Sequence, residues 1–240
     1  HIIEKQNLFD IKVFSNGEVL LQSKKDGVTQ SKTTTLQYFL STFGQSFSTF
    51  ETPILPTNCR KIIKSSNAEL YIFEYPPSVR SIIYDGETYD NVYCPRAIFV
   101  VKIANNGGRR IMSKTDIFLV DPLVPFNENM NLYRWCFNNY NYYKDGRSYI
   151  CWGSANDSYE NILNGNTANY GAFFNLYMSS VFNSHLEPDI SYSGIKQETR
   201  ERMLNVILHL QTEKTFPMSA TYDVRDTVST IIARFKEGSY

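Results

Sequence analysis

The short segment Ile150-Cys151-Trp152-Gly153 places a thiol directly after a predicted strand end and just before a glycine. A thiolate is a strong nucleophile, and a cysteine presented at a loop can carry a covalent intermediate. Cysteine is also among the residues most often buried, where it packs as a small apolar side chain. Both interpretations of Cys151 are open at this level.

The other three cysteines point away from metal or disulfide chemistry. Cys94 and Cys136 have strand-like apolar neighbours, which favours core positions, and Cys59 has no distinctive context. No pair has C-x-x-C spacing, and the chain has only 3 His, so we predict neither a metal site nor a cofactor. Free thiols in a chain of this length predict a reducing, cytoplasmic compartment.

Composition narrows the classes of partner. The chain has 240 residues, with 24 Lys and Arg balanced by 24 Asp and Glu, and this neutral balance argues against nucleic acid as a ligand. No apolar run is long enough to span a bilayer, and no signal peptide is recognised, so we predict no membrane association. Hydrophobic residues make up 42% of the chain and aromatic residues 15%, enough for a sizeable core.

Elements that position the thiol can be predicted along the chain. Alternating segments around Asn16-Gly17 predict an N-terminal β-meander, and the Thr33-Thr34-Thr35 run can cap a short helix over residues 36–43. Residues 1–56 are thus expected to form a meander and a short helix packed on the core. Strand-like runs between residues 60 and 120, including the apolar Ala97–Ile103, then predict an antiparallel meander.

Helical spacing dominates after Cys151. Apolar residues recur at helical intervals over 170–186, 197–210 and 224–235, with Asp223 as the expected cap of the last helix. Strands followed by helices predict an α+β fold, with helices at one end of an antiparallel sheet. We expect a core over residues 57–190 and a C-terminal helical extension over 191–240.

Four segments within residues 70–186 carry a family resemblance. They are Tyr75-Pro76-Pro77-Ser78-Val79-Arg80, Cys94-Pro95-Arg96-Ala97-Ile98-Phe99, the Asn…Gly…Cys-x-Gly pattern of residues 132–153, and the aromatic run from Phe173 to His185. In this order they resemble the prokaryotic ubiquitin-conjugating-enzyme-like family D, which has the UBC fold and includes protein B of the PRTRC gene systems. The core over residues 57–190 is then expected to be UBC-like.

One departure separates this chain from the classical enzymes. Those enzymes carry His-Pro-Asn before the cysteine, whereas the corresponding place here is Phe137-Asn138-Asn139, and family D also lacks that His. Asn139 precedes the cysteine by 151 − 139 = 12 positions, so the intervening turn must be enlarged.

The resemblance implies acyl transfer through a thioester. Cys151 would accept the activated C-terminus of a ubiquitin-like protein, and Asn139, or else Asn138, would donate an N–H to the tetrahedral oxyanion. Asp157 would orient or deprotonate the incoming amine, and His185 is an alternative base. Simpler roles also fit, because an Asn pair suits a turn and a His near a helix end can bind the last carbonyls.

The sequence therefore predicts a ubiquitin-conjugating-like protein whose partners are a ubiquitin-like modifier and a ThiF-like adenylating enzyme. Two alternatives stay open. The missing His-Pro and the longer turn favour a catalytically inactive UBC-fold binding module. The abundance of Asn, Tyr and Phe favours a structural or assembly protein of a mobile element or virus.

Overall fold

The computed structural model describes residues 9–25, 28–39, 54–138, 140–142, 148–186, 190–191 and 193–240. It contains two compact units, His1–Pro53 and Ile54–Tyr240. Within the described residues, no helix is both long and apolar enough to cross a bilayer.

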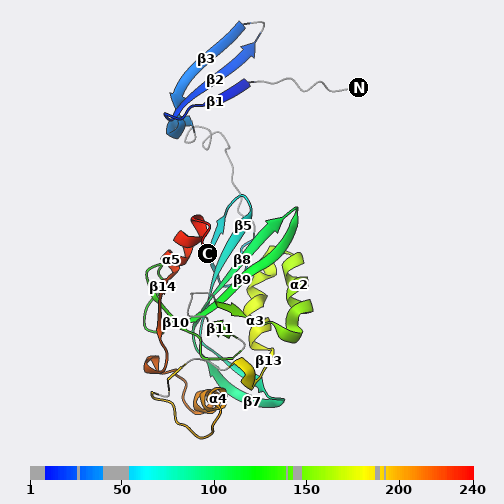
Figure 1. The fold of residues 1–240 in the computed structure, drawn as a ribbon, viewed down its shortest axis with the longest axis vertical. Coiled ribbons are helices and arrows are strands. Elements are labelled where there is room, and N and C mark those ends of the chain that lie inside the picture. The colour runs from blue at the N-terminus through cyan, green and yellow to red at the C-terminus, as the bar shows by residue number, and fades with distance from the viewer. Residues whose placement is uncertain are drawn as a thin grey trace. The chain divides into compact units, whose positions relative to one another are not determined.

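The first unit is a small antiparallel sheet. Its strands β1 (Phe9–Val13), β2 (Glu18–Lys25) and β3 (Val28–Thr35) are hydrogen-bonded in sequence order, which confirms the predicted meander (Figure 1). Gly17 takes φ +82° in the predicted Asn16-Gly17 turn. The Thr35 hydroxyl accepts the Tyr38 N–H at 3.2 Å at the start of a helix, as the sequence predicts, and the end of that predicted helix lies outside the described residues.

The second unit is built on an antiparallel sheet of six strands. Their order across the sheet is β14 (Asp223–Thr227), β10 (Asn131–Arg134), β9 (Arg109–Leu119), β8 (Ala97–Asn106), β5 (Ala68–Tyr75) and β4 (Cys59–Lys64). The chain's first and last strands in this unit therefore form the two edges. Antiparallel sheets followed by helices confirm the predicted α+β class.

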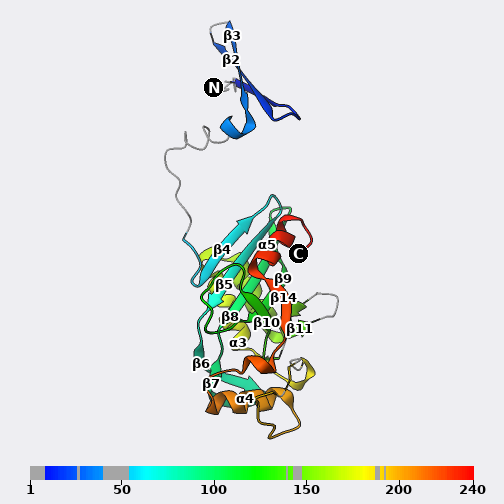
Figure 2. The same ribbon diagram turned by 90° about the vertical axis from the view of Figure 1, so that its left-hand side faces the viewer.

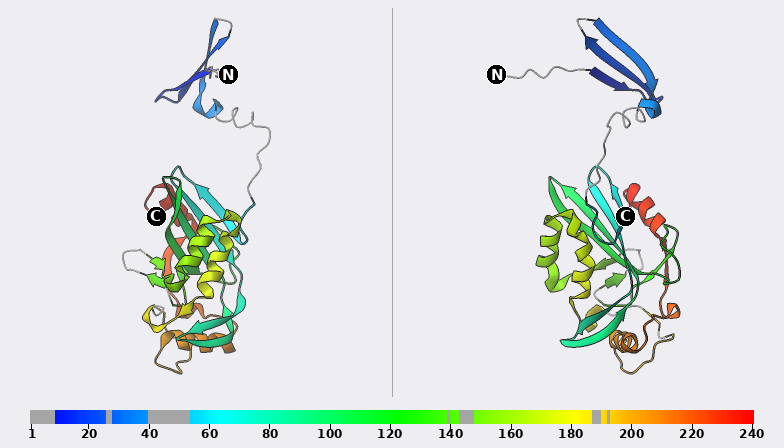
Figure 3. Two further views of the ribbon diagram at one scale, coloured as in Figure 1. Left: turned by 90° about the vertical axis from the view of Figure 1, so that its right-hand side faces the viewer. Right: turned by 180° about the vertical axis from the view of Figure 1, so that it is seen from behind.

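Both faces of the central strands are buried. Alternate residues of β5 and β8 point to opposite faces, so Phe73 and Phe99 belong to one core and Ile72 and Val100 to the other. Helices α2 (Asn156–Asn164) and α3 (Ala172–Met178) cover the first face, and α5 (Val228–Lys236) covers the second (Figure 3). Burial on both sides explains why β8 is a continuous apolar run rather than an alternating one.

A hairpin leaves this sheet between β5 and β8. Strands β6 (Ser78–Tyr84) and β7 (Glu87–Cys94) join at Asp85-Gly86, where both residues have positive φ, 46° and 86°. β5 pairs directly with β8, so the single continuous meander expected from the sequence is corrected. Pro76-Pro77 and Pro95 lie at the two crossings, and residues without an N–H cannot continue a strand ladder.

Helix α4 (Arg202–Thr212) packs on this hairpin (Figure 2). Its buried residues join the core that contains the hairpin residues Ile82, Tyr84 and Val92; they are Met203, Val206, Ile207 and Leu210. At its two ends, the Tyr84 hydroxyl donates to Glu201 Oε2 at 2.9 Å, and Gln211 Nε2 donates to the Asp90 carbonyl at 2.8 Å. The helix is thereby tied to both strands.

Three helix predictions are corrected. The helix expected over 197–210 is α4, which begins at Arg202. The helix expected over 170–186 ends at Met178, where the Ser180 hydroxyl donates to the Tyr177 carbonyl at 2.6 Å, and the chain then forms β13 (Val181–Phe182), parallel to β6. The last helix begins at residue 228, because the preceding residues pair with β10 as β14. Its cap is Thr227, in a capping box with Thr230, rather than Asp223.

We predict that Ile207→Ala lowers the free energy of unfolding of the 54–240 unit by about 2–5 kcal/mol, because the side chain is fully buried between α4 and the hairpin. Urea unfolding followed by tryptophan fluorescence measures this, since Trp135 lies in the same core. Leu208→Ala on the same helix is the control and should cost less. An unchanged midpoint for Ile207→Ala would mean that α4 folds as an independent extension.

Candidate functional site

Cys151 is presented by the alternation of a short strand. It follows β12 (Ser148–Ile150), which pairs with β11 (Tyr140–Tyr142) and lies against β9 (Figure 1). Ile150 is 4% exposed and belongs to the core, whereas Cys151 is exposed. Gly153, at φ +50°, then turns the chain into the 3-10 helix Gly153–Ala155 that precedes α2.

Trp152 anchors the other side of the cysteine. Its ring lies 5.4 Å from the Tyr159 ring of α2 and 6.3 Å from the Phe173 ring of α3, measured between centroids. Its carbonyl accepts the Ala155 N–H at 2.9 Å. The thiol therefore projects from a segment that is held by apolar contacts on both sides.

The other three thiols are shielded. Cys94 and Cys136 are buried, which confirms their predicted core positions, and Cys59 is half-buried. Burial raises the pKa of the Cys94 thiol from 9.0 to about 12, holds the pKa of Cys136 well above its ordinary value, and raises that of Cys59 as well. Among the four cysteines Cys151 is the exposed one, so it is the thiol that a large partner can reach.

Asn138 ties the central stretch, residues 131–153, to Asn183, which follows β13, instead of reaching solvent. Its side chain is fully buried, and Nδ2 donates to the Asn183 carbonyl. Its own carbonyl accepts the Tyr177 hydroxyl of α3 at 2.6 Å. Its Oδ1 is buried without a hydrogen-bond partner among the described residues. This residue holds two parts of the chain together.

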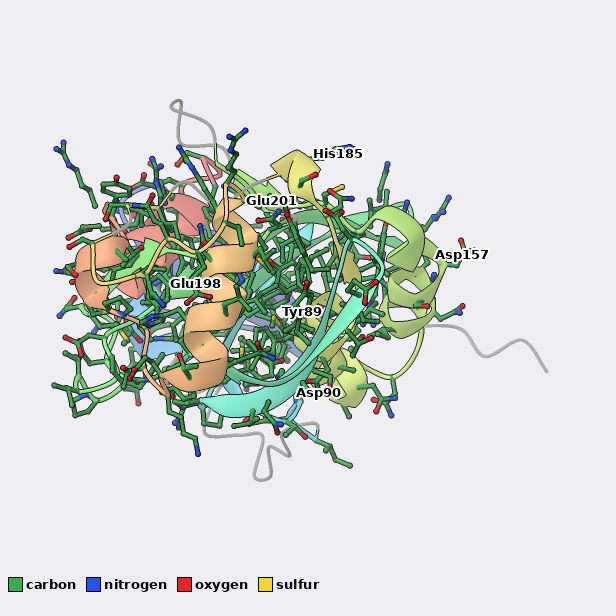
Figure 4. All side chains as sticks on the ribbon, turned by 90° about the horizontal axis from the view of Figure 1, so that it is seen from below. Tyr89, Asp90, Asp157, His185, Glu198 and Glu201 are labelled. Carbon is green, nitrogen blue, oxygen red and sulfur yellow. The ribbon has the colours of Figure 1, made fainter. Side chains whose placement is uncertain are left out.

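The remaining predicted site residues lie apart or outside the described part of the chain. Asn139 is one of the residues that the structure does not describe. Asp157 is exposed in the first turn of α2, where a negative charge is favourable. His185 is exposed in the 3-10 turn Ser184–Leu186, and its backbone N–H donates to Asn183 Oδ1 at 3.0 Å. Figure 4 shows these two side chains on separate elements.

Asn183 links two of the predicted residues. Through its carbonyl it binds Asn138, and through its side chain it binds the backbone of His185. The structure therefore brings Asn138 close to the backbone of His185, while Cys151 lies in the segment that leads into α2 and Asp157 in the first turn of that helix. Within the described residues, no group of three or more His, Cys, Asp or Glu side chains is placed to hold a metal ion.

A polar cleft at the end of α4 was missed from the sequence. It encloses about 540 Å³, and its charged and polar lining includes Lys196, Glu198, His209 and Glu213. Lys196 Nζ donates to Glu198 Oε1 at 2.7 Å, and His209 Nε2 lies 3.3 Å from the Thr215 carbonyl. The four-residue spacing of His209 and Glu213 could have indicated this cleft, because residues four apart lie on one side of a helix. In Figure 4, Glu201 lies at the start of α4 and Glu198 beside the middle of that helix, while Tyr89 and Asp90 lie on β7.

Alkylation should distinguish the four thiols. We predict that iodoacetamide modifies Cys151 in the folded chain within minutes, while Cys94 and Cys136 react only after denaturation because no reagent reaches a buried thiol. Mass spectrometry of peptides from native and denatured samples measures this. The Cys151→Ser variant is the control and should lose the fast reaction. Fast native labelling of Cys94 would contradict the burial described above.

The buried thiols predict an alkaline loss of stability. Because the folded pKa of Cys94 is raised, unfolding releases a proton once pH exceeds the ordinary thiol value, so the stabilisation present below that pH is lost as pH rises. The free energy of unfolding should fall by about 1.4 kcal/mol per pH unit for each buried thiol above about pH 9. Urea unfolding from pH 8 to 10 measures the slope, which Cys94→Ala should make shallower. An equal slope in that variant would contradict the assignment.

Comparison with known proteins does not identify a family for this chain. Protein-family models, curated proteins and solved structures were all compared with the chain, and none matches. The likeness to the ubiquitin-conjugating-like family therefore rests on the four segments described above.

Proposed function

We propose that the chain is a ubiquitin-conjugating-like acyl carrier, which holds the C-terminus of a ubiquitin-like protein as a thioester on Cys151. The observation that carries the proposal is the exposure of this one thiol between two anchored neighbours, Ile150 and Trp152. A carrier cysteine must be reachable by two large partners in turn, the activating enzyme and the acceptor. A thiol on an anchored segment meets that requirement without moving the core.

The chemistry needs an activated acyl donor, which an adenylating enzyme would supply. The Cys151 thiolate attacks the donor carbonyl, a C–S bond forms, and the donor's leaving group departs; the thiol proton passes to solvent. An acceptor amine later attacks the same carbon, the C–S bond breaks, and the thiolate leaves. Asp157 is exposed on the helix that follows the cysteine, and we assign to it the orientation of the amine.

Oxyanion stabilisation does not come from Asn138 in this proposal. Its Nδ2 is bound to the Asn183 carbonyl, and the side chain is buried. Asn139, adjacent in sequence, keeps the role that the resemblance assigns to it. Transfer that lacks a preorganised oxyanion donor would be slower by about 10²–10³-fold.

The commitment of Asn138 to packing also supports a second candidate function. A UBC-like chain in which the Asn138 amide serves only packing could bind a ubiquitin-like partner without forming a thioester. Cys151 would then be an ordinary surface cysteine. The two functions differ in one measurable property, the rate at which this thiol accepts an acyl group.

We therefore predict fast transthioesterification at Cys151. The full chain is incubated with a fluorescent peptide that ends in Gly-Gly as a mercaptoethanesulfonate thioester, and the adduct is followed on non-reducing gels. The adduct should form on Cys151, dissolve with dithiothreitol, and be absent as a thiol-labile species in Cys151→Ser.

An ordinary exposed cysteine provides the matched control. The double variant Cys151→Ser with Ser158→Cys moves the thiol to an exposed position of α2. We expect Cys151 to react at least about tenfold faster, because a carrier thiolate has to be activated by its site. Equal rates at the two positions would favour the binding module and reject the carrier.

A further inference from the structure

The small N-terminal sheet has two edge strands, β1 and β3, and within the described residues neither is paired on its outer side. β1 lies at the edge of the order β1-β2-β3, and within the described residues no strand pairs with its outer side (Figure 1). Ile11 and Val13 on this strand are 41% and 57% exposed. Among the residues of the three strands whose burial is described, Val19 is the buried one. A three-stranded sheet with so little core is only marginally stable, and pairing along an edge strand would stabilise it.

The hairpin geometry shows which backbone groups face outward. The Phe14 N–H donates to the Glu18 carbonyl at 2.9 Å, so position 14 faces β2. The same pairing register continues along the strand, with Lys12 opposite Leu20 and Asp10 opposite Gln22. Because antiparallel strands alternate, positions 9, 11 and 13 direct their N–H and C=O groups to the open edge.

We propose that this edge pairs with β1 of a second copy of the chain, antiparallel and centred on Ile11. Position 11 then faces position 11 of the partner, and positions 9 and 13 face each other, so the outward groups form hydrogen-bonded pairs. The two three-stranded sheets become one continuous six-stranded sheet. A two-fold axis relates the two copies, so each uses the same strand edge in the contact. The edge of both copies is then occupied, and the assembly stops at a dimer.

The charges of β1 select this register. With Ile11 at the centre, Asp10 of each copy faces Lys12 of the other in a non-hydrogen-bonded pair, the closer type of cross-strand contact. Shifting the centre to position 10 places two aspartates opposite each other, and shifting it to position 12 places two lysines opposite each other. The two neighbouring registers are therefore disfavoured by like charges.

Apolar contacts add to the same arrangement. Ile11 and Val13 share one face of the sheet with Leu21 and Val19, their partners on β2. Pairing about Ile11 brings the two copies of this side chain together on that face. The dimer would therefore shield Ile11 and Val13, which are exposed in a single copy.

A charge-swap experiment tests the proposal. Sedimentation equilibrium of the full chain, under reducing conditions to exclude Cys151 disulfides, should show a monomer–dimer equilibrium. Asp10→Lys or Lys12→Asp alone should raise the dissociation constant about tenfold or more, because two opposite-charge pairs become like-charge pairs. The double variant with both substitutions restores the pairs and should dimerise within about threefold of the original chain.

Mixing the two single variants gives the sharpest readout. Asp10→Lys carries two lysines and Lys12→Asp two aspartates, so the mixture should form a heterodimer more tightly than either variant pairs with itself. Lys32→Asp, on the opposite edge strand β3, is the matched control and should not change the equilibrium. A chain that stays monomeric at millimolar concentration, or a dimer that only Lys32→Asp weakens, would overturn the proposal.

Discussion

The contact between Tyr75 of β5 and Phe174 of α3 joins the sheet to the helices that follow the cysteine. The rings stack at 4.2 Å between centroids, and the Tyr75 hydroxyl donates to the Gly171 carbonyl at 2.6 Å. An aromatic pair of this kind contributes about 0.5–1.5 kcal/mol beyond its buried area. Gly171 also lets the backbone at Thr57 approach closely, because a Cβ at position 171 would lie 2.6 Å from the Thr57 carbonyl oxygen. Most of the larger unit is arranged around this point.

From this contact an aromatic chain leads to the presented thiol. Phe174 also meets Trp135 of the central stretch at 6.3 Å, and Phe173, beside it on α3, meets Trp152 at the same distance. Trp152 adjoins Cys151, so the position of the thiol depends on how α3 is seated on the sheet. This explains how an exposed nucleophile can occupy a defined place. The packed neighbours Ile150 and Trp152 hold the Cys151 thiol in position.

Local sequence signals predicted much of the fold. The parts that they did not predict depend on pairing between strands that are far apart in the sequence. The turns at Asn16-Gly17 and Asn105 to Gly108 and the apolar run of β8 were readable, because glycine conformation and burial leave marks in a few residues. The residues of β14 were predicted as the start of a helix, because the partner of this strand is β10, far away in sequence. The site divides in the same way. Cys151 was readable from its neighbours, whereas the link from Asn138 to Asn183 depends on tertiary structure.

The segments that carry the family resemblance mostly serve packing. Pro76-Pro77 ends β5, and the guanidinium of Arg80 lies 5.1 Å from the centre of the Phe174 ring. Arg96 is nearly buried and binds Glu74 through Nε at 2.7 Å. A likeness built on such residues supports a shared architecture more strongly than a shared reaction, because their roles would be the same in an inactive relative. Cys151 is therefore the residue on which acyl transfer would depend, and its rate of acylation distinguishes a carrier from a binding module.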